Sequence, residues 1–105
     1  MGLTEISFFG RFEADILSGK KTITIRDEAE KNFTIGTTVQ VSTFETNRWF
    51  CELLIKDVQP ISIDQLTEYH AKQENMTLDE LKSVIDDIYP GINNLYVISY
   101  SLLNN

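Results

Sequence analysis

The sequence predicts a single α+β domain, built as a small mixed sheet that helices close or half-close. Three observations carry this prediction. Residues 22–26 and 38–42 alternate β-branched or apolar with polar side chains, which is typical of half-buried strands. Two capping-box patterns, beginning at Ser62 and Thr77, indicate helices in the second half of the chain. No repeat, low-complexity tract or linker interrupts the 105 residues, so we expect one domain over residues 1–105.

The N-terminal quarter predicts a strand, a short helix and a second strand. Residues 6–9 are apolar enough for a strand, and apolar residues then recur near helical spacing up to Gly19. In residues 22–26 the alternation turns the two isoleucines towards the core. Thr24 and Arg26 therefore share the opposite face of this strand.

The remaining elements follow from the same rules. The acidic and polar residues 27–32 read as a loop. Each capping box should start a helix, and the second helix has a clear apolar stripe that should end near residues 89–91. The other strands are expected at residues 38–42, 49–55 and 95–102.

The charge balance is strongly acidic. Sixteen acidic and nine basic residues give a formal net charge of -7. Proteins that bind nucleic acids usually carry a basic footprint, because contacts to phosphate dominate their affinity. We therefore expect no extended nucleic acid as a partner, whereas a neutral nucleoside remains an allowed ligand.

Cysteine usage and hydropathy indicate a cytoplasmic protein without a membrane partner. Cys51 is the single cysteine, so neither an intrachain disulfide nor a multi-cysteine metal site can form. We expect Cys51 to be a small core residue on a strand. No apolar stretch approaches the roughly 20 residues that cross a bilayer, and the first residues lack the pattern of a secretory signal.

The most informative stretch is residues 19–26. Gly19, Lys21 and Arg26 match the pattern G-x-K-x-x-x-x-R, the signature associated with the ASCH superfamily. By this resemblance the chain is expected to be a single ASCH domain. Because ASCH domains are similar in fold to PUA domains, the resemblance implies a small mixed β-barrel with flanking helices.

The resemblance extends over nearly the whole chain. Residues 6–28, 70–78 and 88–91 look like the bacterial N4-acetylcytidine amidohydrolases. That resemblance implies hydrolysis of N4-acetylcytidine to cytidine and acetate. It further implies that Lys21 is the proton acceptor, Thr24 the nucleophile and Glu74 the proton donor. We expect no metal and no cofactor, because no metal-binding motif or phosphate-binding glycine-rich loop is present.

These residue types suit the implied chemistry. A threonine hydroxyl attacks an amide carbonyl only when a base takes its proton, and a lysine is a base only when desolvation or a nearby cation lowers its pKa. Lys20 or Arg26 could supply that cation, and burial would keep Glu74 protonated. Residues three apart on a regular strand face opposite ways, so Lys21 must precede the strand or lie at a bulge. An acetyl-threonine intermediate and direct attack by water both remain open.

Arg26 and His70 have competing interpretations. Arg26 either donates hydrogen bonds to the substrate or pairs with a carboxylate such as Glu74. His70 is expected to be structural or helix-capping, since no second histidine or cysteine lies nearby to complete a metal site.

Other polar and aromatic side chains favour ordinary structural roles. Asp86 and Asp87 are neighbours on a helix and point apart, so we expect a solvated face. Trp49 and Phe50 could stack on a cytosine ring, but core packing is the expected role of each.

Two further hypotheses belong to other functional classes. A noncatalytic PUA-like module that binds RNA or modified bases would need neither a threonine nucleophile nor this acidic charge. An interaction protein would keep the pocket only as a feature of the fold. Nothing in the sequence indicates an oligomeric state.

Overall fold

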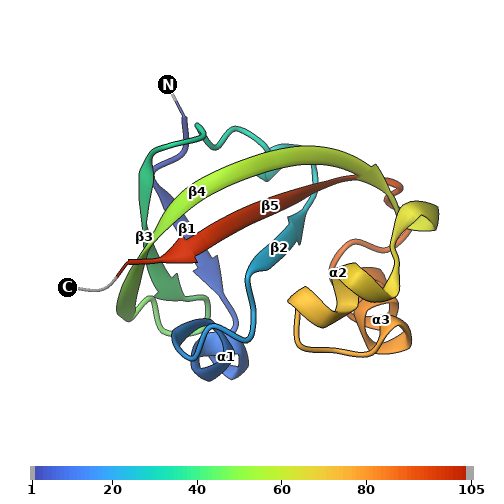
Figure 1. The fold of residues 1–105 in the computed structure, drawn as a ribbon, viewed down its shortest axis with the longest axis horizontal. Coiled ribbons are helices and arrows are strands. Elements are labelled where there is room, and N and C mark those ends of the chain that lie inside the picture. Colours follow the sequence, from blue (N-terminus) through green and yellow to red (C-terminus); the bar gives the residue numbers. More distant parts are fainter. Residues whose placement is uncertain (1, 104–105) are drawn as a thin grey trace.

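Five strands within residues 2–103 form one mixed sheet in the order β1-β3-β4-β5-β2 (Figure 1). The computed structural model describes residues 2–103. β1 runs parallel to β3, and the other neighbouring strands are antiparallel. The strands are β1 (Glu5–Phe8), β2 (Ile23–Arg26), β3 (Thr38–Thr43), β4 (Trp49–Ser62) and β5 (Asn94–Leu102). The prediction of an α+β fold with a mixed sheet is confirmed.

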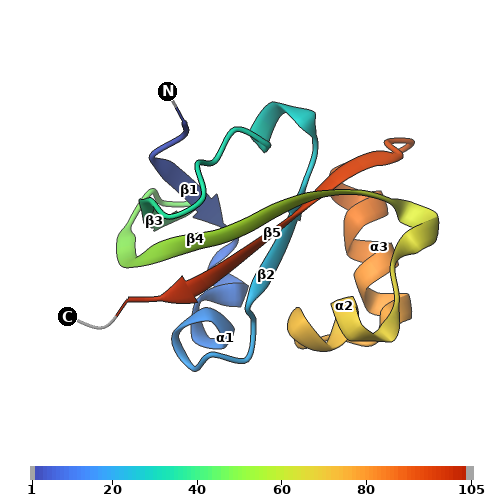
Figure 2. The same ribbon diagram turned by 45° about the horizontal axis from the view of Figure 1, so that its top comes forward.

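In the part of the chain that the structure describes, three α-helices and three 3-10 turns complete the fold. The α-helices are α1 (Glu13–Leu17), α2 (Glu68–Gln73) and α3 (Leu78–Ile88), and the turns are η1 (Gly10–Phe12), η2 (Glu28–Glu30) and η3 (Ile63–Gln65). α3 follows its predicted bounds closely. Figures 1 and 2 both place α1 on one side of β2 and the pair α2 and α3 on the other.

The sheet curves into a barrel that is only partly closed. β1 and β2 are its two edges, and within residues 2–103 no backbone pairing joins them. β4 is shared between both halves of the sheet, because it pairs with β3 along its first part and with β5 along the rest. The side chains of β1 and β2 therefore flank an open seam.

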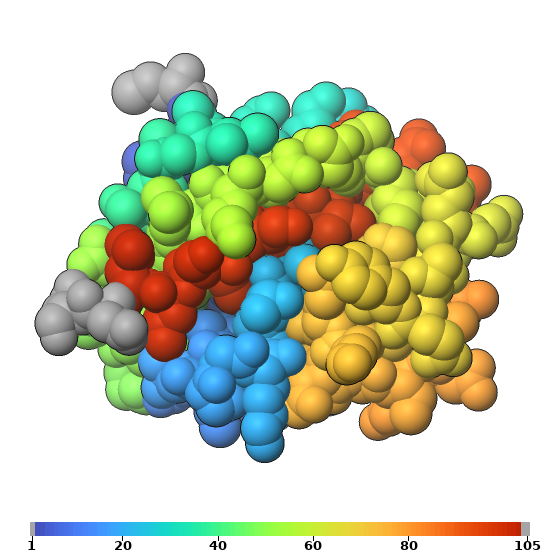
Figure 3. Space-filling view, in the orientation of Figure 1, coloured from blue at the N-terminus to red at the C-terminus, as the bar shows by residue number. Residues whose placement is uncertain are grey.

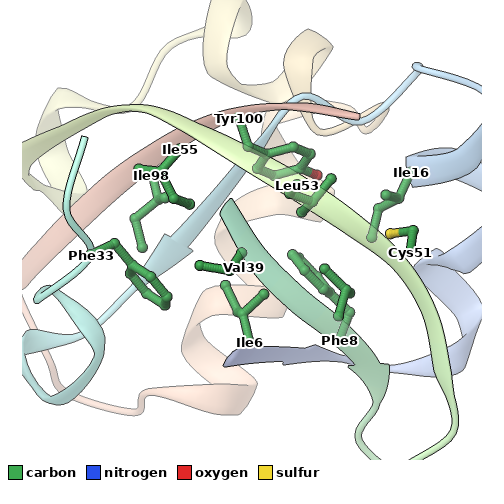
Figure 4. Packing of buried hydrophobic residues seen from close by; sticks show 11 residues of the cluster. Ile6, Phe8, Ile16, Phe33, Val39, Cys51, Leu53, Ile55, Ile98 and Tyr100 are labelled. Atoms are coloured by element: carbon green, nitrogen blue, oxygen red, sulfur yellow. The ribbon is translucent and has the colours of Figure 1, made fainter. Parts of the chain in front are cut away.

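Two apolar clusters form the core, one on each side of this seam. The first lies inside the curved sheet, where Phe8, Cys51 and Tyr100 lie among branched aliphatic side chains (Figure 4). Cys51 is buried on β4, as predicted. The second cluster lies between the sheet and the helices α2 and α3; its buried members are Ile23, Ile25, Leu66, Ala71, Leu81, Ile85, Leu95 and Val97.

β4 is longer than predicted. It continues beyond Ile55 to Ser62, with a register shift between Ile55 and Asp57. The strand passes through Pro60, which pairs with Tyr96 of β5. β3 pairs only with the first part of β4. One side of β4 is therefore without a ladder partner beyond the shift, and proline is tolerated in a strand at such an edge.

The helix expected from the first capping box was wrong. Ser62 and Gln65 do form the box, but only the single turn η3 follows it. Leu66 then has extended dihedral angles and is buried in the second cluster. The α-helix begins only at Glu68, capped by Thr67. Burial of Leu66 thus interrupts the helix that the local pattern favours.

None of the helices within residues 2–103 has the length and apolar character that crossing a membrane requires.

Candidate active site

Lys21 lies in the turn between α1 and β2, before the strand begins. Gly19 has a φ of +80°, a left-handed conformation that glycine adopts without strain. The backbone N–H of Lys21 donates to the carbonyl of Asp15 at 3.0 Å. The next residue, Thr22, donates to the carbonyl of Gln73 at 2.8 Å, so the segment preceding β2 lies against α2 (Figure 3). The prediction that Lys21 lies outside the regular strand is confirmed.

Thr24 and Arg26 lie on one face of β2, and their side chains are joined. Arg26 Nε donates to Thr24 Oγ1 at 2.8 Å. Arg26 Nη1 donates to Glu30 Oε2, and Nη2 to the backbone carbonyl of Ser7, each at 2.7 Å. The carboxylate that pairs with Arg26 is therefore Glu30, and Glu74 has a different partner.

Glu74 is held by the C-terminal turn of α2. It is the C-cap residue, and Asn75 after it has a φ of +57°. The N–H of Asn75 donates to Lys72 O at 3.0 Å, and that of Met76 to Ala71 O at 2.9 Å. These two bonds form a Schellman motif, in which asparagine is one of the few residues that tolerate the left-handed position. This motif directs Glu74 inwards at the end of a short helix.

Lys21 and Glu74 form a buried ion pair. Lys21 Nζ contacts Glu74 Oε1, and the two side chains are only 3% and 6% exposed. The same Nζ donates to the carbonyl of Ile23 at 3.0 Å. It lies 5.0 Å from the centre of the Phe12 ring and 5.7 Å from that of Phe8. An apolar and aromatic environment therefore surrounds the two charged groups.

Burial lowers the pKa of Lys21 to about 7. Desolvation is the larger cause, the positive charge of Arg26 acts in the same direction, and the carboxylate of Asp15 opposes both. Desolvation and a neighbouring cation are the two causes predicted from the sequence, and Arg26 is that cation. A large fraction of Lys21 is consequently a neutral amine near pH 7.

A cavity of about 200 Å³ opens beside these residues, at the seam of the barrel. Its polar lining is Ser7, Lys21, Thr24, Arg26, Glu30, Glu74 and Tyr89. Its apolar lining is Phe8, Phe9, Phe12, Ile25, Phe44, Met76, Leu81, Val84, Ile85 and Ile88. Binding sites for small molecules commonly combine apolar walls with a few convergent polar groups. All four predicted site residues, Lys21, Thr24, Arg26 and Glu74, thus face one cavity.

The residues predicted to be structural mostly are. His70 Nδ1 accepts from the backbone N–H of Thr67 at 3.1 Å, so His70 caps α2 as predicted. Asp86 and Asp87 are exposed on α3, also as predicted. Within residues 2–103, no three histidine, cysteine, aspartate or glutamate side chains gather as ligands of one metal ion.

The core role expected of Trp49 was wrong. Its side chain is 50% exposed, and its indole N–H donates to Gln40 Oε1 at 2.8 Å. Phe50 is half-buried against the first cluster. Neither aromatic ring lines the cavity.

Curated relatives align with nearly the whole chain. A protein of Vibrio vulnificus strain CMCP6 is 64% identical over 97 residues, covering 92% of this chain and 93% of that protein. A protein of Shewanella sp. strain W3-18-1 is 57% identical over 103 residues, covering 98% of this chain and all of that protein. Both relatives are named N(4)-acetylcytidine amidohydrolase. The chain belongs to the N(4)-acetylcytidine amidohydrolase family. No protein-family model matches it.

Solved structures show that this family member has the ASCH fold. The ASCH domain from Lactobacillus crispatus JV V101 superposes with a TM-score of 0.78 at 16% identity, over 96% of this chain and 79% of that one. A protein from Enterococcus faecalis V583 gives a TM-score of 0.75 at 16% identity, over 98% of this chain and 78% of that one. The predicted ASCH architecture is confirmed, with the barrel only partly closed.

Three polar residues of the cavity lining, Ser7, Glu30 and Tyr89, were missed by sequence reasoning. Glu30 had been assigned to a loop, and Tyr89 was noted only as the end of a helix. In the structure Glu30 links Arg26 to the Tyr89 hydroxyl, which donates to Glu30 Oε1 at 3.4 Å. The spacing of Arg26 and Glu30 is the only signal for their pairing, and four residues apart is informative only on a helix.

Proposed function

We propose that this chain hydrolyses N4-acetylcytidine to cytidine and acetate, with Lys21, Thr24 and Glu74 as its reaction centre. The observation that carries the proposal is the buried Lys21–Glu74 pair, which lines one cavity together with Thr24 in a member of this amidohydrolase family. An ion pair so thoroughly removed from water is costly to maintain for stability alone. Its presence at the wall of a cavity therefore favours a chemical role.

The pair can supply both an acid and a base. In an environment of low polarity, a proton shared between an amine and a carboxylate favours the neutral amine with the carboxylic acid. That form has Lys21 ready to accept a proton and Glu74 ready to donate one. Burial thus favours the protonation states that the reaction requires.

In the proposed reaction Thr24 Oγ1 bonds to the acetyl carbon while its proton passes to the Lys21 amine. The bond from this carbon to N4 of the base then breaks, and Glu74 delivers its proton to N4, which leaves as the amino group of cytidine. Water hydrolyses the resulting acetyl ester, releases acetate and restores the threonine hydroxyl. Within residues 2–103 no hydrogen bond joins Lys21 to Thr24, but such catalytic contacts often tighten only when substrate is bound.

Attack by water without a covalent intermediate uses the same residues. Mass spectrometry of protein quenched in acid during turnover distinguishes the two routes. An acetyl group on the peptide containing Thr24 supports the ester. Its absence, together with a linear time course of cytidine formation that has no burst, supports direct attack.

We expect purified protein to convert N4-acetylcytidine to cytidine without added metal and in the presence of a chelator. Chromatography of the products measures the conversion. If folded protein gives no product, the hydrolase proposal is contradicted. Binding to RNA that weakens steeply with salt would then favour the noncatalytic PUA-like module.

The activity should rise with pH through about 7, because Lys21 must be neutral to act as a base. Below that pH its ammonium form is inactive, so log kcat/KM should increase with pH through about 7. The measurement is kcat/KM for N4-acetylcytidine across the range from about pH 5 to 9.

Asp15→Asn provides a control for which the direction of the shift in the pH profile is predicted. The carboxylate of Asp15 raises the pKa of Lys21, so its neutralisation should move the rising limb to lower pH. A rate that does not depend on pH in this range, or a limb that moves upwards in Asp15→Asn, would contradict the role of Lys21 as the base.

A further inference from the structure

The cavity extends from buried side chains to exposed ones. The Lys21–Glu74 pair and Thr24 are almost completely buried. The lining also includes two exposed apolar side chains, Phe44 at 65% and Ile88 at 41%, which mark the mouth of the cavity. Because a substrate enters from solvent, the part of it that follows the acetyl group lies towards this mouth.

Phe44 belongs to the turn that joins β3 to β4, and this turn is bonded to the residues at the end of β1. The N–H of Phe44 donates to the carbonyl of Phe8 at 2.8 Å. The carboxylate of Glu45 accepts from the N–H of Gly10, which lies 2.9 Å from one oxygen and 3.2 Å from the other. These bonds hold the backbone that carries the Phe44 ring at the cavity.

The ring of Phe44 has a face that the protein leaves open. Its centre lies 5.3 Å from that of the Phe9 ring, and the two ring planes are inclined by 69°, which is a T-shaped contact. In such a contact one ring presents an edge and the other a face, so Phe9 covers at most one face of Phe44. The remaining face belongs to an exposed side chain of the cavity lining and is free to contact a ligand.

The chemistry of the proposed substrate matches this arrangement. Single exposed apolar side chains are ordinary, but an apolar surface that continues into a cavity marks a site of ligand contact. In N4-acetylcytidine the flat pyrimidine ring directly follows the acetamide, and the sugar is attached on the opposite side of that ring. With the acetyl group at Thr24, the pyrimidine ring therefore extends towards Phe44 and the polar sugar towards water. Bases stack well on aromatic side chains, since every base has a π-face.

We propose that Phe44 binds the substrate by stacking on its pyrimidine ring at the mouth of the cavity. The inference rests on the proposed function and names the residue that selects a flat aromatic group beside the acetamide. Trp49 and Phe50 were the aromatic residues considered for such stacking from the sequence, but neither lines the cavity. A stacking residue distant from the reacting atoms contributes to binding of substrate and transition state alike, so its loss acts on KM.

The test compares Phe44→Ala, Phe44→Leu and Phe44→Tyr in steady-state hydrolysis of N4-acetylcytidine. Truncating an aromatic side chain that stacks on a base weakens binding by about 10- to 100-fold. We therefore expect Phe44→Ala to raise KM by about that factor with little change in kcat. Phe44→Leu restores an apolar side chain without a flat face and should recover only part of the loss. Phe44→Tyr restores the ring and should have a KM below that of Phe44→Leu.

Trp49→Ala is the matched control, because Trp49 is also an exposed aromatic residue but lies outside the cavity lining. It should leave both KM and kcat unchanged. Glu45→Ala removes the bond to Gly10 that holds the turn, so it should raise KM by a smaller factor than Phe44→Ala. Thermal unfolding of every variant measures the folded fraction to which the rates are normalised.

Binding is also measured without turnover. Calorimetric titration of the Thr24→Val variant with N4-acetylcytidine gives Kd directly, and the same titration of the double variant Thr24→Val with Phe44→Ala gives the contribution of the ring. We expect Kd to rise by the same factor as KM. An unchanged Kd would overturn the inference even if KM had changed, because KM equals Kd only when chemistry is slow.

The outcomes distinguish failure of this inference from failure of the proposed function. Wild-type KM and Kd in folded Phe44→Ala would overturn the stacking role and leave the hydrolase proposal intact. Equal KM values for Phe44→Leu and Phe44→Tyr would mean that apolar contact suffices, which also overturns stacking. If folded wild-type protein shows no turnover, the proposed function fails. A Kd that still depends on Phe44 would in that case support the contact to the base by itself.

Discussion

Thr24→Val is expected to abolish hydrolysis of N4-acetylcytidine, lowering kcat by on the order of 10⁴-fold or more. Valine keeps the β-branched shape that suits β2 and removes only the hydroxyl. Thr24 is 4% exposed and accepts a hydrogen bond from Arg26, so the substitution deletes the proposed nucleophile at a fixed position in the cavity. The measurement is the single-turnover rate of cytidine formation, which reports the chemical step without product release.

Thr24→Ser is the matched control, because it restores a hydroxyl at the same position. We expect it to keep measurable turnover, reduced because serine has more rotational freedom than threonine. Near-normal rates in folded Thr24→Val would remove the nucleophile from the mechanism. Attack by water activated at Lys21 and Glu74 would then account for the reaction.

Lys21→Met is expected to destabilise the protein by roughly 3 to 5 kcal/mol as well as to inactivate it. The substitution leaves the carboxyl group of Glu74 at 6% side-chain exposure without its partner. That carboxyl group is then either an unpaired buried charge or a buried acid without its hydrogen-bond partner, and each costs more than the pair that it came from. Glu74→Leu should also destabilise the protein, because it leaves the buried amine of Lys21 without its partner.

The double variant Lys21→Met with Glu74→Leu should recover most or all of the lost stability while remaining inactive. Buried ion pairs can often be replaced by apolar side chains of similar size without loss, and sometimes with gain. Urea denaturation of the wild type, both single variants and the double variant gives the coupling free energy. Strictly additive effects would mean that water reaches the pair, which would also remove the cause of the lowered pKa of Lys21.

Recovery of stability in the inactive double variant would show that the Lys21–Glu74 pair serves function and not stability. The Schellman turn fixes Glu74, and the turn after α1 fixes Lys21, so two segments far apart in the sequence bring these side chains into contact. A protein selected only for stability would favour an apolar pair at this point. Retaining a buried pair that adds little or nothing to stability, at the wall of a cavity, is a pattern typical of active sites.

Local patterns were sufficient wherever a residue's neighbours along the chain determined its environment. The alternation in residues 22–26 placed Ile23 and Ile25 in the core and Thr24 on the functional face. If Lys21 is to meet Thr24, the alternation of side chains along a strand requires Lys21 to precede the strand or to lie at a bulge, and it precedes the strand. The apolar stripe and the cap at Thr77 defined α3. In each case a short repeat or a cap reports directly on φ, ψ and burial.

Local patterns failed where a distant segment decided the outcome. The capping box at Ser62 produced only a single turn. The turn ends at Leu66, which has extended dihedral angles and is buried in the second cluster. β4 passes through Pro60, because β3 pairs only with its first part. The exposure of Trp49 likewise reflects its position on the sheet surface beside Gln40. Pairing and packing outweigh propensity at all three positions.

The sequence by itself determined the α+β class, the face of β2 that carries Thr24 and, through family resemblance, the set Lys21, Thr24 and Glu74. Only the tertiary structure brought Glu74 against Lys21, gave Arg26 its partners Ser7 and Glu30, and left the barrel open at the seam where the cavity lies. The physical reason is the range of the forces involved. Periodicity and caps act over a few residues along the chain, whereas desolvation and ion pairing depend on segments that meet only after folding.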